Sequence, residues 1–169
     1  MKHLYIFLCL FLLSGAAFSD VTGKAYVTDG DTIKIGDVRV RLQGIDAPEQ
    51  KQKCWKGGQA WLCGQESTKT LNTLINNQII TCKGDTTDQY GRLIAVCYLK
   101  TTDLNAAIVE AGMAVASRKY SIQYVLNEQN ARQKHKGMWT SDFVYPWDWR
   151  QGKRFADGHA YVISIEYRD

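Results

Sequence analysis

The sequence predicts an α+β fold in a single domain, because strand-like and helix-like periods occur in turn along one chain of moderate length. Residues 38–43 alternate aliphatic and polar side chains, as a strand with one apolar face does. Leu71, Leu74 and Ile75 recur at helical spacing, and we assign them to the core. The chain is long enough for one domain with a proper core, but not for two.

The first strands are expected near the start of the folded part. Residues 23–35 and 38–45 are β-rich, and Gly36-Asp37 connects them with glycine first, as a type II′ turn allows. Residues 51–58 are polar and contain glycine, which predicts a loop. A helix is expected to follow from about Gly64.

Two more strands and two more helices complete the expected fold. The strands are predicted at residues 78–83 and 93–99, so Arg92 would stand at the start of the second one. Asp103 is placed to cap a helix that ends at Gly112. A third helix is expected at about residues 125–136, and its basic face would have at most a secondary role in attracting a nucleic-acid backbone.

The end of the chain is less informative. Trp139, Trp147 and Trp149 are expected to pack the C-terminal region. We expect the folded domain to span residues 20–150. Residues 151–169 would be a C-terminal extension of unknown role, in which residues 161–167 alternate like a strand.

Residues 1–19 have the features of a secretory signal peptide. A short basic start precedes an apolar run over residues 4–13, and small residues precede a cleavage point that leaves Asp20 first. An uncleaved anchor is disfavoured because the apolar run is short for a membrane span, and the position of Cys9 does not indicate a lipoprotein. We expect export to the periplasm or the medium, without stable membrane association after cleavage.

Four cysteines remain after the leader: Cys54, Cys63, Cys82 and Cys97. An even number in an exported chain favours two disulfides, which allow three connectivities. If residues 78–83 and 93–99 form a hairpin, Cys82 and Cys97 can lie opposite one another, which leaves Cys54 and Cys63 to close a local loop. A four-cysteine metal site is disfavoured because the sequence has no CxxC pair.

The overall charge is mildly basic. The formal charge of +4 falls to +3 when Lys2 leaves with the leader. Such a charge suits a polyanionic substrate, but many exported proteins share it, so it identifies no substrate by itself.

Residues with chemical potential fall into three separated clusters. They are residues 29–32 (DGDT), 41–49 (RLQGIDAPE) and 90–92 (YGR). Asp31 and Asp46 would supply carboxylate oxygens, the Ala47 carbonyl a neutral oxygen, and water the remainder, as a calcium-sized ion accepts. These clusters contain no thiol or imidazole, which argues against zinc.

The remaining charged residues of the clusters suit a phosphate beside that ion. Glu49 is spare, and a spare carboxylate next to a metal-bound phosphate can act as general base for water. Pro48 stiffens the loop that carries it. Arg41 and Arg92 would face the anion. Considered alone, Arg92 would be interpreted as a solvent-exposed arginine in a hairpin. Its occurrence together with the two acidic clusters favours a phosphate-binding role instead.

The three motifs occur in an order and with a spacing that resembles the staphylococcal (micrococcal) nuclease family, also called thermonucleases, over residues 21–139. The resemblance implies a five-stranded OB-type β-barrel with about three helices. It also implies a calcium-dependent, sugar-nonspecific phosphodiesterase that acts on DNA and RNA and leaves 3′-phosphate ends. A protein of this kind would be expected to be a monomer.

By motif position, the resemblance assigns roles to individual residues. Asp31, Asp46 and the Ala47 carbonyl would bind calcium, Glu49 would be the base, and Arg41 and Arg92 would clamp the phosphate. Many members have Thr where this chain has Ala47, but only the backbone oxygen is needed there.

The resemblance also implies substrate-binding residues. Tyr90 and Tyr120 match tyrosines of the family's nucleotide pocket. Arg118 stands where another tyrosine is common, so base stacking would be altered.

Two other functions fit parts of the sequence. A noncatalytic OB-fold module would bind nucleic acid without cleaving it, but it would not need two aspartates, a glutamate and two arginines together. An exported structural or adhesion domain with a calcium site leaves Arg41 and Arg92 unexplained. The sequence therefore favours a metal-dependent nuclease.

Overall fold

The computed structural model describes residues 20–155. The predicted signal peptide and the strand-like stretch at residues 161–167 lie outside the described residues. No helix within residues 20–155 is long and apolar enough to cross a membrane.

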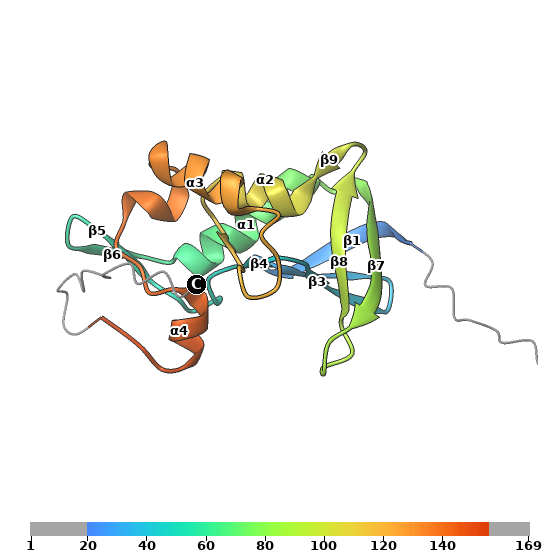
Figure 1. Cartoon of the computed structure of the whole chain (residues 1–169), viewed down its shortest axis with the longest axis horizontal. Helices are drawn as coiled ribbons and strands as arrows, with labels where there is room; N and C mark the ends of the chain where they lie inside the picture. Colours follow the sequence, from blue (N-terminus) through green and yellow to red (C-terminus); the bar gives the residue numbers. More distant parts are fainter. Residues whose placement is uncertain (1–19, 156–169) are drawn as a thin grey trace, which may run out of the picture.

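Five strands close into a mixed barrel, as the resemblance implied. They are β1 (Val21–Asp29), β2 (Thr32–Ile35), β3 (Val38–Leu42), β7 (Ile79–Thr87) and β8 (Leu93–Leu99). Neighbouring strands pair antiparallel in the order β3-β2-β1-β7-β8, and a parallel pairing of β3 with β8 closes the ring. The barrel strands occupy one end of the molecule in Figure 1.

The predicted strand at residues 23–35 is in fact two strands, because the chain reverses at Gly30 and Asp31 to form the β1–β2 hairpin. The backbone N–H of Asp31 donates to Asp29 Oδ1 at 3.0 Å, a local bond that favours a turn over continued strand. The next connection agrees with the prediction. Ile35 pairs with Val38 across Gly36-Asp37, and Gly36 has a φ of 56°.

The helices gather on one side of the barrel (Figure 1). They are α1 (Cys63–Ile75), α2 (Leu104–Glu110) and α3 (Val125–Gln133). Asp103 caps α2 as predicted, since its Oδ1 accepts the N–H of Ala106 at 2.9 Å. Leu71 and Ile75 of α1 are buried in the main core, together with apolar side chains of β2, β3, β7, β8 and α2.

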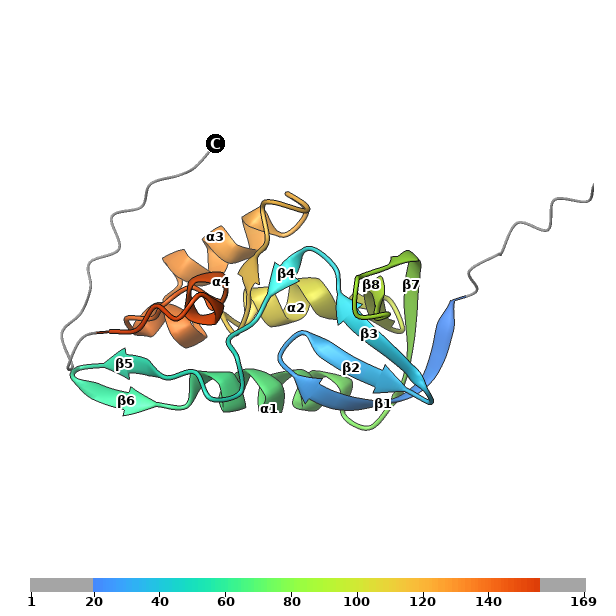
Figure 2. The same cartoon turned by 90° about the horizontal axis from the view of Figure 1, so that it is seen from below.

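The prediction of a loop at residues 51–58 is wrong at residues 54–56, which form the strand β5 (Cys54–Lys56). This strand pairs with β6 (Gln59–Trp61), just beyond the predicted loop, across two glycines at positive φ. Strands of three residues are too short to show a period in the sequence. The hairpin extends away from the barrel (Figure 2) and pairs with the C-terminal region through Trp55 and Asp142.

The C-terminal region adds a 3₁₀ turn (Gly137–Thr140) and a short helix, α4 (Pro146–Arg150), which brings the α-helices within residues 20–155 to four instead of about three. Tryptophans pack this region, as expected. Trp147 stacks on Tyr145 at 4.6 Å between ring centroids, and Trp139 meets Phe143 edge-on at 5.1 Å.

Both disulfides have the predicted pairing. Cys82 lies directly opposite Cys97 in the β7–β8 ladder, with 4.0 Å between their Cα atoms. Cys54 is bonded to Cys63 and ties β5 to the start of α1.

Candidate active site

The three sequence clusters meet in one cavity of about 990 Å³. Its wall is made by barrel strands, the loop at residues 117–120 and the end of α4. The lining includes every residue proposed as catalytic or metal-binding: Asp31, Arg41, Asp46, Ala47, Glu49 and Arg92. It also includes residues to which the sequence analysis gave no role, Asp29 and Arg150 among them.

Asp31 reaches the cavity because the β1–β2 turn is pressed against neighbouring elements. A Cβ atom at Gly30 would lie 2.0 Å from Ser67 Oγ and 2.7 Å from the Ala47 Cβ, so the turn needs glycine. The backbone N–H of Ala47 donates to Asp31 Oδ2 at 2.7 Å. This bond fixes the turn to the loop that carries Asp46.

Asp46 is placed by a short strand, β4 (Ile45–Asp46), where it pairs with Val115 of β10 (Val115–Ala116). Asp31 and Asp46 are only 2% and 3% exposed. Burial raises the pKa of Asp31 to about 8; the charge of Arg41 opposes this, while the charges of Asp29 and Asp46 add to it. Two buried carboxylates that line one cavity favour the binding of cations there.

Arg41 supplies one such cation from β3, where it pairs with Thr32 of β2. Its Nη1 donates to Asp31 Oδ1, and its Nη2 donates to Asp46 Oδ1 at 2.9 Å. Burial alone would lower the pKa of Arg41, but the charges of Asp31 and Asp46 raise it. The guanidinium therefore stays charged and joins the two aspartates.

Arg92 is held in place by Asp88, which lies in the turn between β7 and β8. The Nε of Arg92 donates to Asp88 Oδ2 at 2.7 Å, while Asp88 Oδ1 accepts the backbone N–H groups of Tyr90 and Arg92 at 2.9 and 3.0 Å. The other end of the guanidinium, Nη1, reaches to 3.4 Å from Thr32 Oγ1. Asp88 thus anchors one edge of the Arg92 guanidinium, and the opposite end lies toward Thr32, the neighbour of Asp31 in the sequence.

Glu49 has a partner that sequence reasoning missed. Arg150, the last residue of α4, donates through Nη1 to Glu49 Oε1 at 2.9 Å and to Asp46 Oδ1 at 3.0 Å. Its Nη2 donates to Asp46 Oδ2 at 2.6 Å. Burial alone would lower the pKa of Arg150, but its hydrogen bonds to Asp46 and Glu49 raise it. No local sequence signal marks it, because these contacts join residues about a hundred positions apart.

The three residues predicted to bind substrate are not equivalent. Tyr90 and Tyr120 line the cavity and are 63% and 74% exposed, so their rings are accessible. Arg118 is not among the lining residues. Its Nη2 donates to Glu128 Oε2 at 2.5 Å, and Glu128 is itself buried. Its role in substrate binding remains a prediction.

The donor chemistry fits the proposed hard cation. The buried carboxylates of Asp31 and Asp46 face one cavity, and the Ala47 backbone lies against Asp31, so the available donors are oxygens. Within residues 20–155, no group of three or more His, Cys, Asp or Glu residues gathers as a metal cluster.

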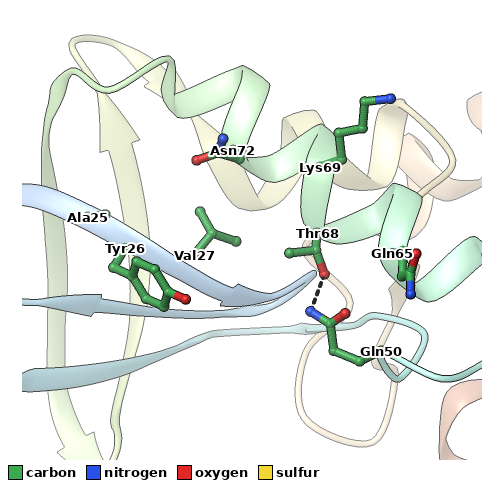
Figure 3. A pocket seen from close by; sticks show the side chains of 8 residues that line it. All are labelled: Ala25, Tyr26, Val27, Gln50, Gln65, Thr68, Lys69 and Asn72. Atoms are coloured by element: carbon green, nitrogen blue, oxygen red, sulfur yellow. Dashed lines mark hydrogen bonds between the residues drawn. The ribbon is translucent and has the colours of Figure 1, made fainter.

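A second hollow, of about 490 Å³, lies between β1 and α1 (Figure 3). Gln50 crosses it and donates to Thr68 Oγ1 at 2.8 Å. Lys69 is the one charged residue of its lining, and it pairs with Glu66 at 3.7 Å. In the part of the chain that the structure describes, no carboxylate is among its lining residues, whereas five carboxylates line the larger cavity.

The sequence of this chain matches a known protein family. Residues 39–141 match the model of the family described as staphylococcal nuclease homologues. The chain belongs to the staphylococcal nuclease family. The family match includes Arg41, Asp46, Glu49 and Arg92, and it ends before α4 and Arg150.

Relatives of the staphylococcal nuclease family match most of this chain. A protein of Escherichia coli O157:H7 named an uncharacterized endonuclease is 35% identical over 159 residues, which cover 88% of this chain and 98% of the relative. A protein of Shigella flexneri named micrococcal nuclease is 32% identical over 164 residues, covering 86% and 89%. A Haemophilus influenzae endonuclease is 32% identical over 136 residues, covering 76% and 71%.

Proposed function

We propose that this protein is a calcium-dependent, sugar-nonspecific nuclease that hydrolyses phosphodiester bonds of DNA and RNA and leaves 3′-phosphate ends. The observation that carries the proposal is the convergence of Asp31, Asp46, Glu49, Arg41 and Arg92 on one cavity. Membership of the staphylococcal nuclease family and the names of the relatives support nucleic acid as the substrate.

Asp31, Asp46 and the Ala47 carbonyl would hold the ion. When bound, calcium would supply a fixed positive charge against a nonbridging phosphate oxygen. The buried carboxylates suit this role, because little competing solvent reaches them and their mutual repulsion falls when a cation binds.

The remaining residues would act on water and on phosphate. Glu49 lines the cavity and its side chain is 42% exposed, so it can accept a proton from the attacking water. Arg92 would bind the phosphate through the end of its guanidinium that Asp88 leaves free. Arg41 would use its further N–H groups in the same way and stabilise the negative charge that grows on the phosphate oxygens.

The nucleotides on either side of the scissile bond would lie against Tyr90 and Tyr120. Both rings are exposed at the cavity, and stacking on an aromatic ring tolerates any base. Arg118 would contribute a charge near the same loop. This arrangement supports cleavage without sequence preference.

We also propose that residues 1–19 direct export to the periplasm or the medium and are then removed. The two disulfides favour an oxidising compartment. Residues 20–150 would form the nuclease domain, with residues 151–169 as its extension. The exported protein would act as a monomer without stable membrane association.

Incubation of purified protein with supercoiled plasmid, in calcium and in chelator, tests the proposed function. We expect nicked and linear DNA in calcium and none in chelator, and RNA should be degraded under the same conditions. A mobility shift without cleavage would favour the noncatalytic binding module instead. End-labelling before and after phosphatase treatment checks for 3′-phosphate.

A further inference from the structure

We propose that Arg150 is a positioning residue of the nuclease site, which holds Glu49 in place from α4 while it competes with the metal ion for Asp46. The inference deepens the proposed function and rests on it. No motif includes Arg150, and the family match ends before it at residue 141.

The contacts of Glu49 carry the first step. Among the described residues, the hydrogen bond from Arg150 Nη1 at 2.9 Å is the one polar contact of the Glu49 carboxylate. Without it, a half-exposed glutamate on a loop would sample several rotamers. A general base must stay within hydrogen-bond reach of its water, so this single contact decides how often Glu49 is correctly oriented.

The contacts of Asp46 carry the second step. Both of its oxygens accept N–H groups from Arg150, at 3.0 and 2.6 Å, and Oδ1 also accepts from Arg41. A metal ion at Asp46 must share these oxygens with a guanidinium and must sit near its positive charge. Arg150 should therefore weaken metal binding even while it orders the base.

Arg150 can position another side chain only if α4, the helix that carries it, is itself held in place. The side chain of Gln52 is fully buried, and its Nε2 donates to the carbonyl of Val144 at 2.6 Å. The backbone N–H of Glu49 donates to Gln52 Oε1 at 3.2 Å. One buried amide thus joins the loop of Glu49 to the segment that leads into α4.

Aromatic packing orders the same segment from within, and a hydrogen bond from β6 attaches it to the rest of the protein. Tyr145 stacks on Trp147 and meets Phe143 edge-on at 5.5 Å. Trp61 of β6 donates through Nε1 to Ser141 Oγ at 2.9 Å. Hydrogen bonds from Gln52 and Trp61 thus attach the segment at residues 141–150 to the rest of the protein. Arg150 therefore extends into the cavity from a helix that is held in place.

The test uses Arg150→Gln and Arg150→Lys in the full exported chain, with Arg154→Gln as the matched control. Arg154 lies just beyond that segment and carries the same charge, but its guanidinium packs over Trp149 at 3.4 Å, and its hydrogen bonds within residues 20–155 go to backbone carbonyls and not to the cavity carboxylates. Calcium affinity is measured by calorimetry, and steady-state cleavage of an oligonucleotide gives kcat and KM.

For Arg150→Gln we expect calcium to bind several-fold more tightly, while kcat falls about tenfold to a hundredfold and KM changes little. Arg150→Lys keeps the charge but loses the fork, so its calcium affinity should stay near that of the wild type and its kcat should recover only in part. Arg154→Gln should match the wild type in all three values.

Tighter calcium binding together with a lower kcat distinguishes a positioning role from a general loss of structure, because a loss of structure would lower both the calcium affinity and kcat. A rise in KM with unchanged kcat would make Arg150 a ligand of the substrate, and a rise in kcat at limiting calcium would make it an inhibitory cation; either result overturns the proposal. Wild-type-like values for Arg150→Gln also overturn it. If the wild type itself does not cleave in calcium, the proposed nuclease function fails instead.

Discussion

Two arginines approach Asp46 from different directions, Arg41 from β3 and Arg150 from α4, and a third, Arg92, is anchored by Asp88. Three carboxylates, those of Asp31, Asp46 and Glu49, face them. Among the described residues, the whole cavity lining has five carboxylates and four arginines, and of these Asp31 and Asp46 are buried. Each residue has a different set of partners, and this difference allows metal binding, proton transfer and phosphate binding to be separated by mutation.

Asp46 and Glu49 should divide metal binding from catalysis. Asp46→Ala removes one of the two proposed carboxylate ligands, so calcium affinity should fall and added calcium should restore part of the activity. Glu49→Gln keeps the size of the side chain but cannot usefully accept a proton, so turnover should collapse with much less change in calcium affinity.

Calorimetric titration of calcium in the presence of a nucleoside 3′,5′-bisphosphate, beside single-turnover cleavage, measures both quantities for the two variants. If Glu49→Gln lost calcium binding as completely as Asp46→Ala, Glu49 would be a primary ligand, and its assignment as the base would be wrong.

Arg92→Lys tests whether the forked guanidinium matters. Lysine keeps one charge but cannot bind Asp88 with one edge and phosphate with the other, so we expect kcat to fall by about a hundredfold or more in a folded protein. Circular dichroism and a melting curve provide the control for folding. Near-normal turnover would return Arg92 to the role of a surface arginine in a hairpin.

At the scale of elements, the β7–β8 turn should depend on pH through Asp88. Burial alone would raise the pKa of Asp88, but hydrogen bonds from Arg92 and Tyr90 lower it below its ordinary value. A lowered pKa in the folded state means that the ionised carboxylate stabilises the fold. This contribution is present above the unfolded-state pKa and is lost as the pH falls through the lower folded-state value.

Asp88→Asn should therefore be less stable than the wild type at neutral pH, and the difference should shrink as the pH falls into the acid range where Asp88 is protonated. Urea unfolding of both proteins across that range measures the difference. A constant difference between the two proteins at every pH would show that the ionised form of Asp88 has no special role in the turn.

Short local motifs explain which elements and residues could be predicted from the sequence. Asp31 and Arg41 stand beside or in strands with a two-residue period, Glu49 lies in the short motif that follows them, and Cys82 and Cys97 follow from the register of one hairpin. The β5–β6 hairpin and α4 were missed because strands of three residues and a helix of little more than one turn are too short to show a period.

Arg150 and Gln52 could not be predicted for a different reason. The bonds of Arg150 to Asp46 and Glu49 span 104 and 101 residues, and Gln52 reaches Val144 across 92. No local rule connects positions so far apart. Only the path of the folded chain past β5 and β6 brings α4 back to the cavity.

At the scale of the whole molecule, the two disulfides stabilise different parts. Cys82–Cys97 joins neighbouring barrel strands within the main core, whereas Cys54–Cys63 belongs to a second buried cluster with Met138 and Phe143. The first should therefore affect global stability. The Cys54–Cys63 bond should affect how the C-terminal segment packs, and through that segment the position of Arg150 in the cavity.

Replacement of Cys82 and Cys97 by alanine should lower the free energy of unfolding by about 3 kcal/mol, because the bond closes a loop of 15 residues in the unfolded chain. Turnover at temperatures where the variant is folded should stay close to that of the wild type, since neither cysteine lines the cavity. Denaturant unfolding and steady-state kinetics at 25 °C provide the two measurements. A large loss of turnover in the folded variant would contradict this division.

Replacement of Cys54 and Cys63 should give the opposite balance. The bond closes a shorter loop of 9 residues, so its entropic contribution to stability is smaller. The hairpin that it holds bonds Trp55 to Asp142 and Trp61 to Ser141, and these contacts seat the segment that leads to Arg150. We therefore expect kcat to fall several-fold with little change in KM, and adding Arg150→Gln to this variant should lower kcat by less than it does in the wild type. Full additivity of the two changes would show that the hairpin and Arg150 act on the site independently.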